Sequence, residues 1–382
     1  MSINSKCLVC SSNFYDEALL SFKNMPSSAQ GFPELEELKK DKGADLNVYQ
    51  CSSCGLIQLD INPVSYYKKV IRASGFSNEM IEFRFGQFNT WIKKYNLTNK
   101  KILEVGCGKG EYLEILSNSG VKAFGVEYSM SSVNYCKQKG LSVTQGFLGD
   151  EEFSLEEKQY DGFMCLSFME HWPNPNNVLD ALCQNLPDGA IGLIEVPNFD
   201  MILEKGLYSE FISDHLMYFT EETLKSTLHL NGFEVLESKS IWHNYILSVV
   251  VRKRVRTDLD FMKGLRVKVK SDIDNFINST KINKVAIWGA GHQALATISL
   301  TKIENSIEYI VDSAVFKQGR YSPASHIPIV SEDELKKNPV DAVIIMAGSY
   351  SAEILKILDN NYPKIQVAIL REYGLEIINH KL

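Results

Sequence analysis

Apolar positions along the middle of the chain follow the spacing of alternating strands and helices. Lys101–Val105 is a short run of strand-forming residues, and a glycine-rich stretch comes directly after it. Glu111–Ser119 then carries apolar residues at helical spacing, and Val121–Val126 is a second apolar run that ends before Glu127. Strand, glycine loop, helix and strand in this order predict a parallel α/β domain with a ligand site at the loop.

The same pattern returns nearer the C-terminus. Val285–Trp288 and Ile307–Val311 are apolar runs of strand length, and a Gly-x-Gly-x-x-Ala stretch follows the first of them. Residues 261–277 have helical spacing and predict a connecting helix, while residues 63–97 predict a helical cover over the first domain. The pattern as a whole predicts an α/β chain with two Rossmann-like domains.

Composition fits a protein with several folded domains. The 382 residues include 40 Lys and Arg against 47 Asp and Glu, a net charge of −7, and 45% of them are hydrophobic. At roughly 150 residues per domain, this length predicts two to three domains. The acidic balance argues against nucleic acid as a partner, because no basic face offsets it.

Nothing in the sequence indicates a membrane or an export signal. No apolar run reaches the roughly 18 residues that a membrane-spanning helix needs. The first residues, MSINSKCLVC, lack the basic-then-apolar order of a signal peptide. We therefore expect a cytoplasmic protein whose thiols stay reduced, and we take a monomer as the default state.

Four of the eight cysteines form two Cys-x-x-Cys pairs, Cys7 with Cys10 and Cys51 with Cys54. Two such pairs supply four thiolates, which is the ligand set of a closed structural zinc site. A redox motif needs only one such pair, and the remaining interpretation is four unrelated buried thiols. We predict a zinc site that holds residues 1–62 together and takes no part in catalysis.

The glycine loop at residues 106–110 indicates a ligand that carries a ribose. Glycines let the backbone approach a ligand at the N-terminus of the following helix. Glu127 stands at the end of the next strand, where a carboxylate can accept hydrogen bonds from both ribose hydroxyls. Taken alone, this pattern also fits a dinucleotide.

The details of this segment resemble the class I S-adenosylmethionine methyltransferases. Residues 104–110 (EVGCGKG) resemble the first motif of that family, residues 160–167 (YDGFMCLS) its fourth-strand region and residues 190–197 (AIGLIEVP) its fifth strand. His171 matches a position that usually shapes the turn after the fourth strand. The resemblance implies a class I methyltransferase core in which the methyl donor is held by Glu104, Gly106, Gly108, Gly110, Glu127 and Ser167.

Asp214 and His215 are adjacent in a predicted loop between the fifth strand and a helix that begins after Thr220. A histidine with an ordinary pKa near 6.5 is suited to removing a proton at neutral pH. His215 is therefore a candidate general base, and the alternative is an ordinary surface histidine.

Residues 289–294, with Asp312 about 20 residues further on, fit an NAD fingerprint when taken alone. However, residues 317–329 (KQGRYSPASHIPI) resemble the C-terminal domain of sugar C-methyltransferases that act on nucleotide-linked 4-keto deoxysugars. Those enzymes join an N-terminal zinc-binding domain, a central methyltransferase domain and a Rossmann-like C-terminal domain. The same order here implies domains at residues 1–62, 63–255 and 256–382.

This second resemblance implies roles on the acceptor side. His215 matches the general base of the family, and Asp214 stands where the family has a glutamate. The chain departs from the family at Ile212, where the family has a tyrosine, and at residues 289–292, where Gly-Ala-Gly-His replaces a small-residue-plus-lysine pattern. The implied substrate contacts are Tyr67 (or its neighbour Tyr66), His243, Gly289, Gly291 and His292.

We therefore predict a methyltransferase that uses S-adenosyl-L-methionine, contains a structural Zn²⁺ and methylates a carbon of a nucleotide-linked 4-keto deoxysugar. Its expected partner is this small nucleotide-sugar substrate. The nearest alternative is O- or N-methyl transfer to another sugar nucleotide or glycan precursor. Two other classes stay open, namely an NAD-binding enzyme with a vestigial donor site and a non-catalytic zinc scaffold.

Overall fold

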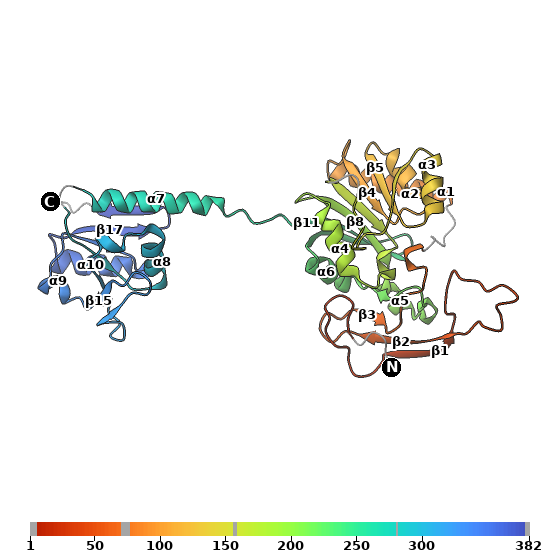
Figure 1. The fold of residues 1–382 in the computed structure, drawn as a ribbon, viewed down its shortest axis with the longest axis horizontal. Helices are drawn as coiled ribbons and strands as arrows, with labels where there is room; N and C mark the ends of the chain where they lie inside the picture. Colours follow the sequence, from red (N-terminus) through yellow and green to blue (C-terminus); the bar gives the residue numbers. More distant parts are fainter. Residues whose placement is uncertain (1–5, 70–76, 156–158, 280–281, 379–382) are drawn as a thin grey trace. The chain divides into compact units, whose positions relative to one another are not determined.

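The computed structural model describes residues 6–69, 77–155, 159–279 and 282–378. The chain divides after Arg256 into two compact units, and we describe each by itself (Figure 1). The segment predicted to bind zinc lies in the first unit, together with the methyltransferase segment. Within the described residues, no helix is both long enough and apolar enough to cross a membrane.

The first unit is built around a seven-stranded sheet that is parallel except where β11 pairs antiparallel with β8 and with β10. Parallel strands β5 and β7 lie on either side of β4, so the chain order reverses at β4. In spatial order the strands are β10 (Phe233–Ile241), β11 (Ile246–Lys253), β8 (Ile191–Pro197), β7 (Gly162–Leu166), β4 (Lys101–Val105), β5 (Lys122–Glu127) and β6 (Ser142–Gln145).

Both faces of this sheet carry hydrophobic side chains, which are buried against the helices of the unit. In β4, Leu103 and Val105 belong to one buried cluster and Ile102 to another, because successive residues of a strand point to opposite faces. The helices and short 3₁₀ turns of this unit are η1 (Tyr67–Lys69), α1 (Asn78–Lys94), α2 (Glu111–Ser117), α3 (Met130–Gln138), η2 (Met169–His171), α4 (Pro175–Gln184), α5 (Phe199–Lys205), η3 (Tyr208–Glu210) and α6 (Glu221–Leu230).

The predicted helical cover at residues 63–97 is represented by η1 and α1. Residues 70–76 lie outside the described residues. Ser77 caps α1 by accepting a hydrogen bond from the backbone N–H of Met80. The helix buries Phe88 and Trp91 in the same hydrophobic cluster as α2, so it packs on the methyltransferase core.

A second, antiparallel sheet joins the N-terminal segment to the methyltransferase core. Its order is β1-β2-β3-β9, and Ile57 of β3 pairs with Tyr218 of β9. Strand β9 comes from the loop that contains His215, so the N-terminal sheet ends beside that loop. The strands are β1 (Leu20–Met25), β2 (Ala44–Gln50), β3 (Ile57–Leu59) and β9 (Met217–Tyr218).

The second unit is a separate Rossmann-like domain. Its central strands are parallel and its edge strands β14 and β18 are antiparallel. In spatial order the strands are β14 (Arg320–Tyr321), β15 (Pro328–Val330), β13 (Tyr309–Val311), β12 (Val285–Trp288), β16 (Ala342–Ile345), β17 (Gln366–Arg371) and β18 (Gly374–Ile378). Its helical elements are α7 (Asp260–Ile277), α8 (His292–Thr301), η4 (Glu304–Ser306), α9 (Glu334–Lys337), η5 (Gly348–Tyr350) and α10 (Ser351–Asn361).

Candidate active site

The glycine loop between β4 and α2 adopts a backbone that favours glycine. Gly106, Gly108 and Gly110 have φ angles of 73°, 57° and 82°. A Cβ added to Gly106 would lie 2.5 Å from Cδ1 of Phe168, so a side chain at this position would collide with that ring. Glycine at position 106 therefore lets the loop backbone pass close to Phe168 at the carboxyl end of β4, which is where ligands bind in parallel α/β sheets.

Glu127, the last residue of β5, holds this loop in place. Its carboxylate accepts hydrogen bonds from the backbone N–H groups of Ser129 at 2.7 Å and Gly108 at 3.0 Å. Burial raises the pKa of Glu127, although these backbone hydrogen bonds partly offset that effect. The carboxylate thus lies beside the glycine loop, where the sequence places a ribose ligand.

The other donor-site residues predicted from the sequence also belong to this region. Ser167 directly follows β7, is exposed, and has a φ of 52°. Glu104 is buried within β4, one strand away from β7. The carboxyl ends of β4, β5 and β7 therefore bring together the residues assigned to the donor site.

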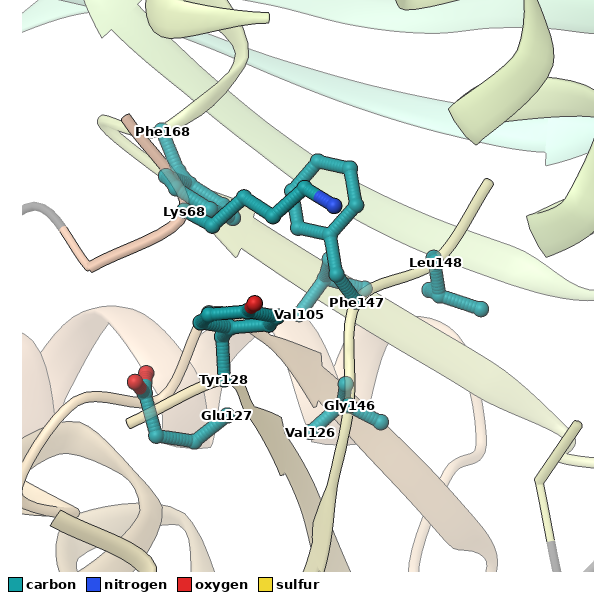
Figure 2. A pocket seen from close by; sticks show the side chains of 10 residues that line it. Lys68, Val105, Val126, Glu127, Tyr128, Gly146, Phe147, Leu148 and Phe168 are labelled. Carbon is teal, nitrogen blue, oxygen red and sulfur yellow. The ribbon is translucent and has the colours of Figure 1, made fainter. Parts of the chain in front are cut away.

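A pocket lies beside the loop, and Figure 2 shows the side chains that line it. Phe147 and Phe168 meet edge to face, with ring centroids 6.1 Å apart. Such a set of rings next to an acid suits a ligand with an aromatic base and a ribose. The lining residues are Lys68, Val105, Gly106, Val126, Glu127, Tyr128, Gly146, Phe147, Leu148 and Phe168.

The sequence analysis missed most of this pocket wall. Residues 146–148 directly follow β6, and the carboxyl end of a neighbouring parallel strand meets the same edge of the sheet. Their position after this strand could therefore have indicated that these residues line the site. Lys68 gave no comparable signal, because η1 reaches the pocket only through the tertiary fold.

Two histidines and a buried acid lie next to the pocket residue Phe168. The rings of Phe168 and His171 are 6.4 Å apart, and those of His171 and His215 are 4.7 Å apart. Oε1 of Glu170 is 3.8 Å from Nε2 of His171. The candidate base His215 is thus connected to the donor pocket through His171.

Burial controls the protonation of this group. It lowers the pKa of His215 to about 3, with a smaller effect from His171, and it also lowers the pKa of His171. Both imidazoles are therefore neutral at physiological pH, and a neutral imidazole can accept a proton. Burial raises the pKa of Glu170 to about 8, and its Oε2 has no hydrogen-bond partner among the described residues.

Asp214 is buried and makes its contacts away from His215. Its carboxylate accepts hydrogen bonds from the hydroxyl of Tyr66 at 2.5 Å and from the backbone N–H of Ala29 at 2.6 Å. Its backbone carbonyl lies 2.7 Å from Nδ1 of His171. Among the described residues, no hydrogen bond joins the Asp214 carboxylate to the His215 ring. The carboxylate contacts Tyr66 and Ala29, and the backbone carbonyl contacts His171.

Tyr66, and not Tyr67, reaches Asp214. The ring of Tyr67 instead packs edge to face against Phe147 of the donor pocket, with centroids 5.8 Å apart. His243 is exposed in the turn between β10 and β11, where its φ is 57°. The structure brings His215 and His171 together, and it places His243 in a separate turn.

The four N-terminal cysteines converge. Their sulfur atoms all lie within 4.8 Å of one another, and the Sγ–Sγ distances are 3.6 Å for Cys7 and Cys54 and 3.4 Å for Cys10 and Cys51. Tetrahedral zinc with Zn–S bonds of about 2.3 Å separates its sulfurs by roughly 3.8 Å. The geometry and the ligand type therefore fit zinc.

In the second unit, the backbone of the glycine loop is hydrogen-bonded to the acid that follows the next strand, Asp312. A Cβ on Gly289 would lie 2.7 Å from the carbonyl oxygen of Met346. Asp312 accepts hydrogen bonds from the backbone of Ala290 at 2.8 Å and from Nζ of Lys317 at 2.9 Å. Burial opposes ionisation of Asp312, but Lys317 and the backbone donors outweigh burial and lower its pKa. This carboxylate is engaged within its own domain, an arrangement that does not favour an NAD ribose.

Gly291 and His292 stand at the start of α8 in this second unit. A Cβ on Gly291 would meet nothing within 4 Å, and His292 is exposed as the first residue of the helix. Both positions are therefore open to a ligand at the carboxyl end of β12.

Two family models match the chain. One, described as a methyltransferase domain, matches residues 80–238, and the other, described as a C-methyltransferase C-terminal domain, matches residues 256–364. The C-methyltransferase NovU of Streptomyces niveus is 19% identical over 391 residues, which cover 92% of this chain and 91% of that protein. The ubiquinone biosynthesis O-methyltransferase of Acinetobacter baylyi is 29% identical over 142 residues, 34% of this chain and 59% of that protein.

Solved structures of methyltransferases are also similar to part of the chain. An S-adenosylmethionine-dependent methyltransferase from Clostridium acetobutylicum aligns with 50% of this chain and 96% of its own, at 14% identity and a TM-score of 0.39. The plantazolicin methyltransferase BpumL in complex with S-adenosylhomocysteine (SAH) aligns with 46% of this chain and 86% of its own, at 17% identity and a TM-score of 0.38.

The glycine loop, its acid Glu127 and most residues of the aromatic pocket lie within residues 80–238, which match the model described as a methyltransferase domain. The second family model covers the C-terminal unit and also describes a methyltransferase. The chain is an S-adenosylmethionine-dependent methyltransferase.

Proposed function

We propose that the chain transfers a methyl group to a carbon atom of a nucleotide-linked 4-keto deoxysugar. The observation that carries this proposal is a neutral, partly buried imidazole, His215, connected through His171 to the donor pocket. The match of residues 256–364 to a C-methyltransferase C-terminal domain supports it, as does the similarity to NovU over 92% of the chain. So does the resemblance of residues 317–329 to the sugar C-methyltransferases.

The methyl donor is already activated, so the main chemical task of the protein is to supply a base. S-adenosylmethionine supplies an electrophilic methyl group on a sulfonium sulfur. In the substrate, the 4-keto group acidifies the adjacent C3–H bond. His215 removes that proton, and the electrons of the C–H bond form an enolate whose C3 bonds to the methyl carbon as the sulfur–carbon bond breaks.

The other residues of the site position the reactants. Glu127 and the glycine loop hold the donor, and His171 fixes the location of His215. Asp214 anchors His171 through its backbone carbonyl and Tyr66 through its carboxylate, which favours a positioning role for Asp214. Such positioning supplies a large part of the rate in a reaction between two bound substrates.

The four cysteines bind a structural zinc ion in this proposal. Backbone N–H groups of Ser53 and Cys54 donate to Sγ of Cys51 at 3.4 Å, which stabilises a thiolate. A site with four thiolates leaves no open coordination position, so this ion stabilises the N-terminal segment and does not act on the substrate.

The substrate-binding role of the second unit is also part of the proposal. Gly289, Gly291 and His292 lie at the carboxyl end of β12, where Rossmann-like domains bind ligands. Nucleotide-sugar binding by this domain follows from the family resemblance. With residues 1–62 and 63–255 of the first unit, it makes up the proposed three-part organisation at residues 1–62, 63–255 and 256–382.

The test is product analysis with a panel of nucleotide sugars. The purified chain is incubated with S-adenosylmethionine and matched sugar nucleotides with and without a 4-keto group, and the products are identified by mass spectrometry and NMR. We expect one added methyl group, on carbon, only with the keto sugars. A methylated product formed equally from sugars without the ketone would contradict the proposal.

One observation favours a second candidate, which is O-methyl transfer to a sugar nucleotide. Ile212 stands where the sugar C-methyltransferases have a tyrosine, so a polar group on the acceptor side is absent. The O-methyltransferase of Acinetobacter baylyi is similar over 34% of this chain. A methyl group on a sugar oxygen in the panel experiment would select this candidate.

A further inference from the structure

Three consecutive residues of η1 and its N-terminal flank contact both sides of the reaction site. Tyr66 donates to Asp214 on the side of the histidines, and Tyr67 packs against Phe147 of the donor pocket. Lys68 donates to both carboxylate oxygens of Asp150, at 2.7 and 2.8 Å. Asp150 follows the loop after β6 that forms one wall of the pocket.

Lys68 lies over the aromatic wall of the donor pocket. Its Nζ is 5.1 Å from the centroid of the Phe147 ring and 5.2 Å from that of Tyr128, and Figure 2 shows its side chain extending over Phe147. The Lys68 side chain is 23% exposed and that of Asp150 is 38% exposed. An ammonium group at this distance from an aromatic ring makes a cation–π interaction, and partial burial strengthens it.

Lys68 keeps its positive charge in this position. Burial acts to lower the pKa of Lys68, but Asp150 and the neighbouring tyrosines outweigh burial and raise it. Lys68 is therefore a cation over the pocket at physiological pH. Its partner Asp150 comes from a different segment, 82 residues away in sequence.

We propose that Lys68 and Asp150 are donor-binding residues, and that their ion pair forms the outer wall of the pocket for the adenosine part of the methyl donor and its product. The pair fixes Lys68 over the rings that would stack on the adenine base, so it lowers the dissociation constant of any ligand with that base. The proposal rests on the donor site and is independent of the acceptor that is methylated.

The test measures binding of SAH to the full chain by isothermal titration calorimetry, without any acceptor. Lys68→Met keeps the length of the side chain and removes its charge, and Asp150→Asn removes the partner charge. We expect each variant to raise the dissociation constant of SAH about tenfold, with the double variant no weaker than the singles, because the two residues act as one pair. Fully additive effects in the double variant would overturn the pairing.

Two matched variants separate this role from a structural one. Lys139→Met breaks an exposed ion pair with Glu114, which lies on the surface of the same unit, and should leave SAH binding unchanged. Tyr66→Phe removes the hydroxyl that contacts Asp214, Ser28 and the backbone N–H of Gln30, and it should change the SAH dissociation constant less than twofold. Equal weakening by Tyr66→Phe and Lys68→Met would mean that the whole segment moves, which would overturn a specific role for Lys68.

The melting temperature without ligand completes the test. We expect Lys68→Met to melt close to the wild-type chain while binding SAH more weakly. A lower melting temperature with unchanged SAH affinity would make the ion pair merely structural and overturn the proposal. Failure of the wild-type chain to bind SAH would overturn the donor site itself, and is thus distinguishable from failure of the ion pair alone.

Discussion

His215 is the residue on which the chemistry depends in this account. A histidine on the surface would be largely neutral at pH 7 and charged at pH 5, whereas burial lowers the pKa of His215 to about 3. The imidazole is therefore neutral at physiological pH, which is the protonation state that a general base requires. Its neighbour His171 is fixed by the carbonyl of Asp214, which keeps the two rings together.

The first prediction isolates the proton transfer from the methyl transfer. In D₂O with SAH in place of the donor, the chain should exchange the C3 proton of a 4-keto sugar nucleotide for deuterium. His215→Asn should slow this exchange about 100-fold or more, because a positioned base contributes at least that much. The measurement is NMR of the C3 proton, with SAH binding as proof that the site is intact.

The matched control is His229→Asn, which changes an exposed histidine at the end of α6. It should exchange the proton at the wild-type rate. Wild-type exchange in His215→Asn would show that another group is the base.

Glu170 gives a prediction on stability at the same scale. Its pKa is about 8 in the folded chain and near 4.5 when exposed, so the folded chain binds more protons between these values. A raised pKa stabilises the fold at low pH, and this contribution is lost as the pH rises from 4.5 through 8. Glutamine does not ionise, so Glu170→Gln does not lose this stability. The melting temperature of the variant should therefore rise relative to that of the wild type as the pH increases from 5 to about 8.

Melting curves followed by circular dichroism across this pH range measure the effect. Glu204→Gln, an exposed change on α5, should leave the pH dependence as it is in the wild type. A constant difference between Glu170→Gln and wild type at every pH would contradict the raised pKa.

At the scale of elements, the parts of the site that depend on local sequence were predictable. The strand, glycine loop and helix around Gly106 follow from apolar spacing and glycine positions, and the structure has β4, the loop and α2 there. The contact of Ala29 with Asp214 was not predictable, because it joins residues 185 apart. Strand β9 has two residues, too few for any periodic pattern to indicate it.

The N-terminal sheet carries its own prediction. Because β3 pairs with β9, two residues beyond His215, loss of the zinc site should loosen the loop that holds the base. Cys10→Ser should lose its zinc, measured by elemental analysis, and lower the melting temperature by about 5–10 °C. Methyl transfer should fall with it.

The control is Cys183→Ser, which replaces a half-buried thiol outside the cluster. It should retain one zinc per chain and melt within a few degrees of wild type. Purified wild-type chain without zinc, or full stability in Cys10→Ser, would contradict a structural metal site.

At the scale of the molecule, two Rossmann-like units serve different purposes in this account. Both have a glycine loop followed by an acid, and this pattern by itself does not tell a donor site from an NAD site. The structure separates them by what the acid contacts: Glu127 lies beside an aromatic pocket, whereas Lys317 neutralises Asp312. Sequence pattern gives the fold of each unit, and only side-chain contacts distinguish the ligands.

The central claim is that the new bond joins two carbon atoms. The most direct measurement uses S-adenosylmethionine with a ¹³C-labelled methyl group and a 4-keto sugar nucleotide that is ¹³C-labelled in its sugar ring. We predict a one-bond carbon–carbon coupling between the transferred methyl group and C3 of the sugar. A labelled methyl group that shows no one-bond coupling to any sugar carbon would place the methyl group on oxygen or nitrogen and contradict the account.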